Sequence, residues 1–156
     1  MAYDDLRSFL ETLDEHGQLL RITEEVMPEP DVAAAANAAC RLGDGAPALY
    51  FDNITGFTSA RIAMNVHGSW ANHALALGMD KTSSTKDQVD EFIRRWAKFP
   101  IKPEGRENPP WAENTVEGED INIFEILPLV RLNDGDGSAT VTVSFQPLEQ
   151  PSRFAG

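Results

Sequence analysis

The stretch at residues 47–79 constrains the fold more than any other part of this chain. It holds two short apolar runs, A-L-Y-F at 48–51 and R-I-A-M-N at 61–65, separated by D-N-I-T-G at 52–56. Asn, Asp and Gly tolerate tight backbone angles, so the separator predicts a turn. Ser69 is placed to cap a following helix, and Gly78 to end it. The stretch therefore predicts a strand, a turn, a second strand and a helix.

The segment before this stretch adds two helices and one strand. Apolar residues recur at helical spacing near the start and predict a helix over 4–16: Leu6, Phe9, Leu10 and Leu13. Gly17 fits the left-handed position after that helix, and residues 18–23 are typical of a strand. The prolines at 28 and 30 break the pattern, and Asp31 is expected to cap an alanine-rich helix over 32–42.

The segment after residue 79 predicts one more helix and a long connection. Thr85 and Gln88 have the spacing of a capping box and open a helix over 85–98. Its apolar residues share one face, which is expected to be buried: Val89, Phe92, Ile93 and Trp96. Prolines at 100, 103, 109 and 110 predict an extended loop over 100–114. Residues 121–130 are expected to form a short strand or helical turn that packs back on the domain.

Composition narrows the class of protein. The chain has 156 residues, which suits one domain or one domain with an extension. A net charge of −12 repels phosphate backbones, so nucleic acid and anionic membrane are poor partners. No segment approaches the ~20 apolar residues of a membrane helix, and the N-terminus lacks the pattern of a signal peptide. With one cysteine, the chain is expected to work in the cytoplasm. No local basic site for a small anion is evident.

The residues most able to bind a metal or take part in catalysis are three histidines and one cysteine. His67 and His73 are six positions apart and His16 is distant, a spacing that fits no zinc motif. Cys40 has no C-x-x-C partner, and its apolar helix predicts a buried structural thiol.

Three short motifs also have simpler interpretations. The G-D-G at 43–45 is expected to end a helix rather than bind phosphate, because no helix or lysine follows closely. Ser69 lies in H-G-S-W-A, which is not a nucleophile elbow. The N-D-G-D-G at 133–137 lacks the spacing of a calcium loop and predicts a turn. The sequence therefore assigns no catalytic, cofactor-binding or metal-binding residue.

Five blocks together resemble one family. They are D-L-R-S-F-L-E-T-L at 5–13, G-Q-L-L-R-I at 17–22, P-A-L-Y-F-D-N-I-T-G at 47–56, M-N-V-H-G-S-W-A-N-H-A-L-A-L-G-M at 64–79 and F-E-I-L-P-L-V-R-L-N-D-G-D-G at 124–137. In order and spacing they resemble the UbiD-type aromatic acid decarboxylases, above all the large subunit of bacterial hydroxyarylic (4-hydroxybenzoate, vanillate or phenolic acid) decarboxylases. The likeness covers residues 1 to about 137, the front third of an ordinary family member.

The resemblance implies a non-oxidative carboxy-lyase that works as a homo-oligomer. Its cofactors would be prenylated flavin mononucleotide, supplied by a separate flavin prenyltransferase, with Mn²⁺ and K⁺. The flavin and metal ligands and a glutamate–arginine–glutamate network would lie in later domains. No residue of this chain matches one of those positions, so none is assigned here and this chain is expected to bind no cofactor.

The expected fold is α+β, with a small mixed β-sheet flanked by helices. The expected organisation is an α/β domain at 1–99, a proline-rich connection at 100–120, a lead into a flavin-binding domain at 121–137, and a tail at 138–156 without a family counterpart. The expected function is that of the N-terminal domain of such a decarboxylase, a truncated product inactive on its own. The alternatives are an interaction module that associates through residues 121–130, and an independent enzyme that uses His67 or His73.

Overall fold

The computed structural model describes residues 3–100, 102, 105, 107–109, 112–118 and 121–130. Its elements in chain order are α1 (Leu6–Glu15), β1 (Leu19–Ile22), a π-helical turn (Pro28–Val32), α2 (Ala33–Cys40), a 3₁₀ turn (Gly43–Gly45), β2 (Ala48–Phe51), β3 (Ile62–Met64), α3 (Trp70–Ala76), α4 (Thr85–Trp96) and α5 (Ile123–Ile126). The strands form one sheet in the order β1-β2-β3, with β1 parallel to β2 and β2 antiparallel to β3. This mixed sheet confirms the predicted α+β class.

The first helix forms where the apolar spacing predicts it. Asp5 caps it, because its Oδ1 accepts the N–H of Ser8 at 2.8 Å while the N–H of Asp5 donates to Ser8 Oγ at 3.3 Å. Gly17 ends it with φ +70°, a left-handed conformation that glycine adopts without strain. Leu13 on this helix is fully buried.

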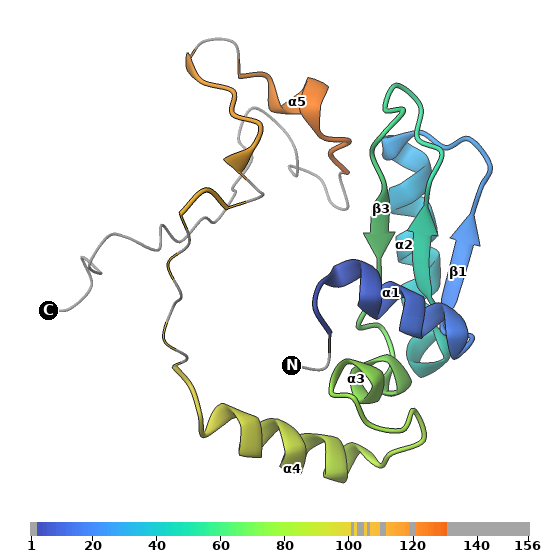
Figure 1. Ribbon diagram of the computed structural model, residues 1–156. Coiled ribbons are helices and arrows are strands. Elements are labelled where there is room, and N and C mark those ends of the chain that lie inside the picture. The colour runs from blue at the N-terminus through green and yellow to red at the C-terminus, as the bar shows by residue number, and fades with distance from the viewer. Residues whose placement is uncertain are drawn as a thin grey trace, which may run out of the picture.

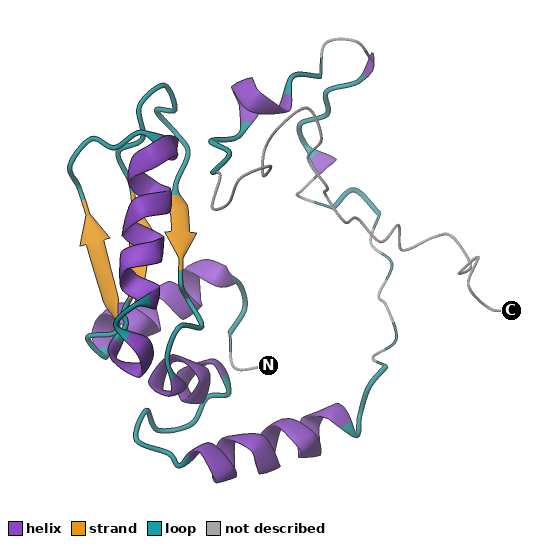
Figure 2. Ribbon diagram, turned by 180° about the vertical axis from the view of Figure 1, so that it is seen from behind, coloured by secondary structure: helices purple, strands orange, loops and turns teal. Residues whose placement is uncertain are grey.

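The central strand β2 is buried on both faces of the sheet. Figures 1 and 2 show α1 crossing one face and α2 crossing the other. Ala48 belongs to the cluster formed with α1, whereas Leu49 and Phe51 belong to the cluster formed with α2. Because β1 and β2 are parallel, the chain must cross over between them, and α2 is that crossover. The core therefore depends on one four-residue strand.

A tight joint links β3 to α3. Asn65 has φ +54°, and its Nδ2 donates to the carbonyl of Pro47 at 2.9 Å. The N–H of Gly68 returns to the carbonyl of Asn65 at 3.0 Å. Ser69 Oγ accepts the N–H of Asn72 at 3.1 Å, which confirms Ser69 as the helix cap. A β-carbon on Gly68 would collide with the Asn65 side chain, so glycine is required there by packing.

The predicted burial of the apolar face of α4 is wrong. Four side chains on that face are 45–59% exposed: Val89, Phe92, Ile93 and Trp96. On the side toward α3, Gln88 is 2% exposed, whereas Val89 and Phe92 beside it border an open cavity and stay about half exposed. Periodicity identifies an apolar face but not what covers it. The cap is also one residue earlier than predicted, because Ser84 Oγ accepts the N–H of Asp87 at 3.2 Å.

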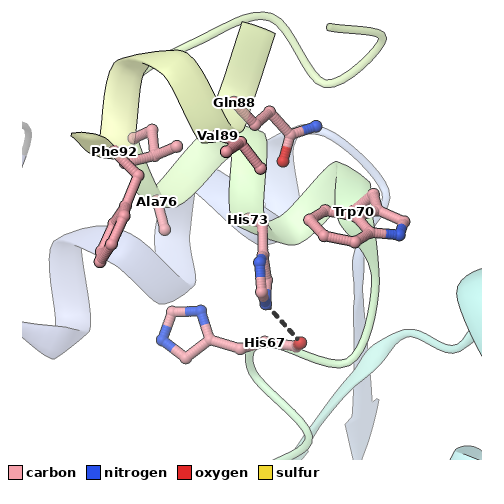
Figure 3. Close-up of a pocket in the computed structure, with 8 residues that line it drawn as sticks. His67, Trp70, His73, Ala76, Gln88, Val89 and Phe92 are labelled. Atoms are coloured by element: carbon pink, nitrogen blue, oxygen red, sulfur yellow. Dashed lines mark hydrogen bonds between the residues drawn. The ribbon is translucent and has the colours of Figure 1, made fainter. Parts of the chain in front are cut away.

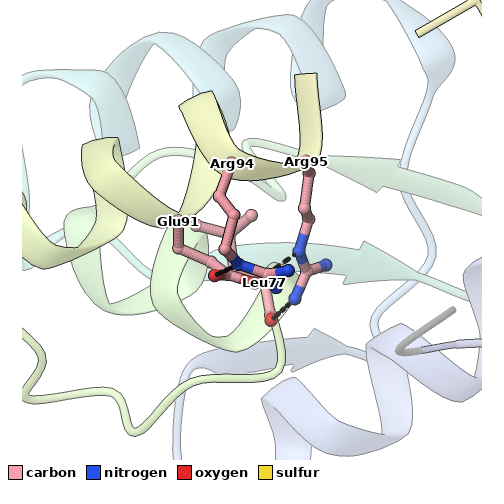
Figure 4. A network of polar contacts seen from close by, with 4 residues as sticks. All are labelled: Leu77, Glu91, Arg94 and Arg95. Carbon is pink, nitrogen blue, oxygen red and sulfur yellow. Dashed lines mark hydrogen bonds and ion pairs between the residues drawn. The ribbon is translucent and has the colours of Figure 1, made fainter. Parts of the chain in front are cut away.

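Polar contacts attach α4 to the end of α3 (Figure 4). Glu91 accepts two hydrogen bonds from Arg94, at 2.6 and 2.7 Å, and one from Arg95 at 2.7 Å. Arg95 in turn donates to the carbonyl of Leu77 at 2.5 Å. Hydrogen bonds from the two guanidinium groups lower the pKa of Glu91 to about 2. The carboxylate therefore stays ionised at neutral pH and orients Arg95 toward α3.

Two smaller predictions about α2 are also wrong. Asp31 does not cap the helix: its Oδ2 accepts the N–H of Met27 at 2.9 Å, and the chain enters α2 through the π-helical turn. Cys40 is exposed rather than buried, because the face of α2 that packs inward carries Ala36 and Ala39.

Residues 121–130 do return to the domain. The only regular element there among the described residues is the short helix α5, and Val130 packs against the core cluster of Val32, Leu49 and Phe51. Ile126 and Leu127 remain about half exposed. The predicted turn at 133–137 and the tail at 138–156 lie outside the described residues.

We expect Phe51→Ala to destabilise the domain by about 3–5 kcal/mol, because Phe51 is 1% exposed and its loss opens a cavity between β2 and α2. Phe92→Ala is the matched control: that side chain is 53% exposed, and its loss should cost under about 1 kcal/mol. Urea unfolding followed by circular dichroism at low protein concentration measures both. Equal losses would show that α4 carries its apolar face inward.

We expect Gly68→Ala to destabilise the domain by about 1–3 kcal/mol, since the added methyl group must displace the Asn65 side chain and its hydrogen bond to Pro47. Gly45→Ala serves as the control, because a β-carbon there meets nothing within 4 Å and its φ is not positive. Thermal unfolding of the two variants tests the difference. A Gly68→Ala variant as stable as Gly45→Ala would contradict the packing at this joint.

Candidate functional site

The two histidines noted in the sequence meet where β3, α3 and α4 come together (Figure 3). His67 lies in the turn after β3, and His73 and Trp70 lie on α3. With Val89 and Phe92 of α4 they line a cavity of about 210 Å³. The joint described above sets this geometry, because it fixes where α3 starts relative to the turn that carries His67.

The two imidazole rings contact each other, and one of them also contacts a backbone carbonyl. Their centroids are 5.6 Å apart in an edge-on arrangement, and His73 Nε2 lies 3.0 Å from the carbonyl of His67. The ring of His67 also stacks on Phe9 at 5.6 Å. Partial burial, with a smaller contribution from His73, lowers the pKa of His67. His67 is therefore neutral at pH 7 and packs as an aromatic ring.

A metal ion would need more ligands than this cavity offers. Zinc in proteins takes three or four side-chain ligands. In the part of the chain that the structure describes, no three His, Cys, Asp or Glu side chains are grouped so that they could hold a metal. Neither zinc nor the Mn²⁺ that the family resemblance implies fits the described residues.

Ser69 and Asp44, which line an adjacent pocket with His67, Trp70 and His73, have structural roles. Ser69 is 4% exposed and its Oγ already accepts the helix N–H of Asn72, so it is not presented to a substrate. Asp44 Oδ1 accepts the N–H of Trp70 at 2.6 Å. The G-D-G turn after α2 therefore ends one helix, as predicted, and also supports the start of α3. This second role was missed, since nothing in the sequence pairs residues 44 and 70.

A second hollow brings together charges that the sequence analysis did not connect. A groove of about 620 Å³ between α1 and the sheet is lined by three arginines, Arg7, Arg21 and Arg61, from α1, β1 and the approach to β3. No sequence pattern connects these arginines. The folded sheet brings Arg21 and the strand after Arg61 together, because its register pairs Arg21 with Tyr50 and Tyr50 with Ala63.

The charges in this groove are largely compensated. Arg21 donates to Asp14 at 2.9 Å and lies 5.2 Å from the centre of the Tyr50 ring. Asp5 and Glu11 line the same groove, and Arg7 reaches Asp5 at 3.4 Å. The expectation that the chain offers no evident basic site therefore needs refinement: three guanidinium groups converge, but carboxylates accompany them.

Within the described residues, the helices are too short or too polar for any of them to cross a lipid bilayer.

Comparison with known proteins identifies the family. The model of the 3-octaprenyl-4-hydroxybenzoate carboxy-lyase N-terminal domain matches residues 10–92. A phenolic acid decarboxylase of Streptomyces sp. (strain D7) is 71% identical over 137 residues, which are 88% of this chain and 29% of that protein. A phenolic acid decarboxylase of Escherichia coli O157:H7 is 63% identical over 158 residues, 99% of this chain and 33% of that protein. The predicted boundary at residue 137 stays a prediction, since the two matches reach different distances along the chain.

The fold of this chain is also similar to that of a solved structure. The closed form of the vanillic acid decarboxylase of Sedimentibacter hydroxybenzoicus superposes with a TM-score of 0.75 at 55% identity, over 86% of this chain and 28% of that chain. This chain thus spans about a third of the length of the relatives it matches. Because the family model covers more than half of its residues, the protein belongs to the family of the 3-octaprenyl-4-hydroxybenzoate carboxy-lyase N-terminal domain, the N-terminal part of UbiD-type decarboxylases.

Proposed function

We propose that this chain is a scaffold domain of a phenolic acid decarboxylase and does not decarboxylate by itself. The supporting observation is the contrast between the high sequence identity to such an enzyme and the small share of its length that this chain covers. The chain is 71% identical to such an enzyme but corresponds to 29% of its length. Of the side chains with chemical interest, His73 contacts a backbone carbonyl, Ser69 caps α3 and Arg21 pairs with Asp14.

The remaining two thirds of the enzyme would supply the chemistry. In this proposal the whole enzyme takes a hydroxyarylic acid such as 4-hydroxybenzoate or vanillate and releases CO₂. Prenylated flavin mononucleotide, Mn²⁺ and K⁺ would bind outside this chain, and a flavin prenyltransferase would deliver the flavin. The whole enzyme would be a homo-oligomer working in the cytoplasm, where a protein with one exposed cysteine stays reduced.

The domain fits a supporting role physically. β2 is covered on both faces, and the joint at Asn65 and Gly68 has its own hydrogen bonds, so the fold needs no bound cofactor to close its core. A rigid domain of this kind can hold the other domains in position without touching the substrate.

The test is an assay of the purified chain. We expect no CO₂ release from 4-hydroxybenzoate or vanillate when the chain is supplied with prenylated flavin, Mn²⁺ and K⁺, and no change in the flavin absorbance spectrum on mixing. The full-length vanillic acid decarboxylase of S. hydroxybenzoicus, in the same mixture, is the positive control. Turnover by the chain that exceeds a no-protein blank would overturn the proposal.

If turnover appeared, His67→Ala and His73→Ala would separate the two remaining explanations. Loss of activity in either variant, with an unchanged circular dichroism spectrum, would assign the chemistry to the histidine cavity. Unchanged activity in both would assign it to residues outside that cavity.

A further inference from the structure

The cavity between α3 and α4 is lined by a buried amide whose oxygen the fold leaves without a hydrogen bond. Gln88 lines this cavity and is 2% exposed; its Nε2 donates to the carbonyl of Ser83 at 2.9 Å, but its Oε1 has no partner within the described residues. Reversing the amide would bring two acceptors together at Ser83, so the oxygen keeps its place. Figure 3 shows it turned from α4 toward His73 and Trp70. Because an unpaired buried acceptor is costly, a hydrogen-bond donor inside the cavity would be stabilised there.

The walls around this acceptor are mainly aromatic. The ring of His73 lies 5.3 Å from that of Trp70 and 5.6 Å from that of His67, both edge-on. Val89 and Phe92 line the cavity from α4. His73 Nε2 already contacts the carbonyl of His67, so the rings act chiefly as flat walls. Such walls favour a ligand that is itself an aromatic ring.

The cavity offers nothing to a charged ligand. Its described lining residues include no lysine, arginine or carboxylate. His67 is neutral at pH 7, because burial lowers its pKa. An anion would lose its hydration here without gaining a cation, and the net charge of −12 on the chain would repel it from a distance. The ligand is therefore expected to be neutral.

The volume limits the ligand to one ring. The cavity measures about 210 Å³. An apolar cavity of about 150 Å³ suffices for benzene. We propose that this cavity binds a neutral single-ring phenol, whose hydroxyl donates a hydrogen bond to Gln88 Oε1 and whose ring packs among Trp70, His73 and Phe92.

A phenol is also what the proposed reaction would leave. Loss of CO₂ from 4-hydroxybenzoate puts hydrogen in place of the carboxylate and gives phenol, which keeps its proton at pH 7. The cavity would thus separate product from substrate by charge. Only this source of the ligand rests on the proposed function. Binding is measured without flavin or turnover, so a failure to bind would leave the scaffold role standing, and turnover by the chain would leave a measured binding constant unchanged.

The first experiment titrates the ¹⁵N-labelled chain with phenol and follows the indole N–H signals by NMR. Trp70 lines the cavity, whereas Trp96 is 59% exposed on α4 and does not line it. We expect the Trp70 signal to shift with a Kd of roughly 1 mM, which suits a ligand of this size, and the Trp96 signal to stay in place. Trp96→Phe identifies its signal. Equal shifts of both signals would indicate attachment to any exposed ring and would overturn the proposal, as would a Trp70 signal that stays fixed up to roughly 10 mM phenol.

Related ligands test the chemistry of the contact. Anisole has the ring but no hydroxyl hydrogen, so it should bind about fivefold more weakly than phenol. 4-Hydroxybenzoate adds a carboxylate and should bind at least about tenfold more weakly. Equal affinity for phenol and either of these ligands would contradict the proposal. Tighter binding of N-acetyltyrosinamide than of phenol would also overturn it, because the occupant would then be a tyrosine of the remaining family polypeptide.

Substitutions on α4 locate the ligand. Val89→Phe enlarges a lining side chain and should weaken phenol binding at least about fivefold. Ile93→Phe is the matched control, since Ile93 is 59% exposed on the same helix and does not line the cavity, and it should leave the Kd unchanged. Equal binding by these two variants would place phenol elsewhere and overturn the proposal.

Gln88→Leu tests the acceptor itself. It removes Oε1 and should weaken phenol binding about fivefold while leaving anisole binding unchanged. The substitution also removes the hydrogen bond to Ser83, so circular dichroism checks the fold. If this variant does not fold, the comparison of phenol with anisole tests the same contact in the unmodified chain. Undiminished phenol binding by a folded Gln88→Leu variant would show that Oε1 is not the acceptor and would overturn the proposal.

Discussion

Burial of one strand, β2, from both sides holds the domain together. Its alternate side chains enter two separate clusters, with Ala48 against α1 and Leu49 and Phe51 against α2. A strand covered on both faces is typically a continuous apolar run, which A-L-Y-F is. The neighbouring strands then differ in direction, because the chain reaches β2 from β1 through a helix and leaves it for β3 through a turn.

A second constraint, the joint after β3, positions everything beyond the sheet. Asn65 takes a left-handed conformation and bonds to Pro47 at the start of β2, so the turn is fixed to the strand beside it. Ser69 and Asp44 then satisfy N–H groups in the first turn of α3. This is why the conspicuous cluster of His67, Trp70 and His73 is a structural one. Ser69 Oγ and Asp44 Oδ1 complete the helix start, and His73 contacts the carbonyl of His67.

The α4 helix inverts the usual arrangement of a surface helix. A helix with one apolar stripe normally turns that stripe to the core. Here Arg95, bound to the carbonyl of Leu77, ties α4 to the end of α3, and the apolar side chains stay about half exposed, although Val89 and Phe92 also line the cavity beside α3. In a family whose members are about three times as long, such a face has an obvious use as a contact surface. Which surface it meets is a question of association rather than of folding.

Local signals in the sequence were enough to place most elements of the fold. They located α1, β1, β2, β3 and α3 to within a few residues, through the helical spacing in Leu6–Glu15, the cap at Ser69 and the stop at Gly17. The five motif blocks also pointed to the correct family. Contacts between distant residues were beyond such signals, and the tertiary structure decided them. The outward face of α4, the exposed thiol of Cys40, and the meeting of Arg7, Arg21 and Arg61 in one groove are of this kind. Periodicity shows that a face is apolar, but only the positions of the other elements decide whether anything covers it.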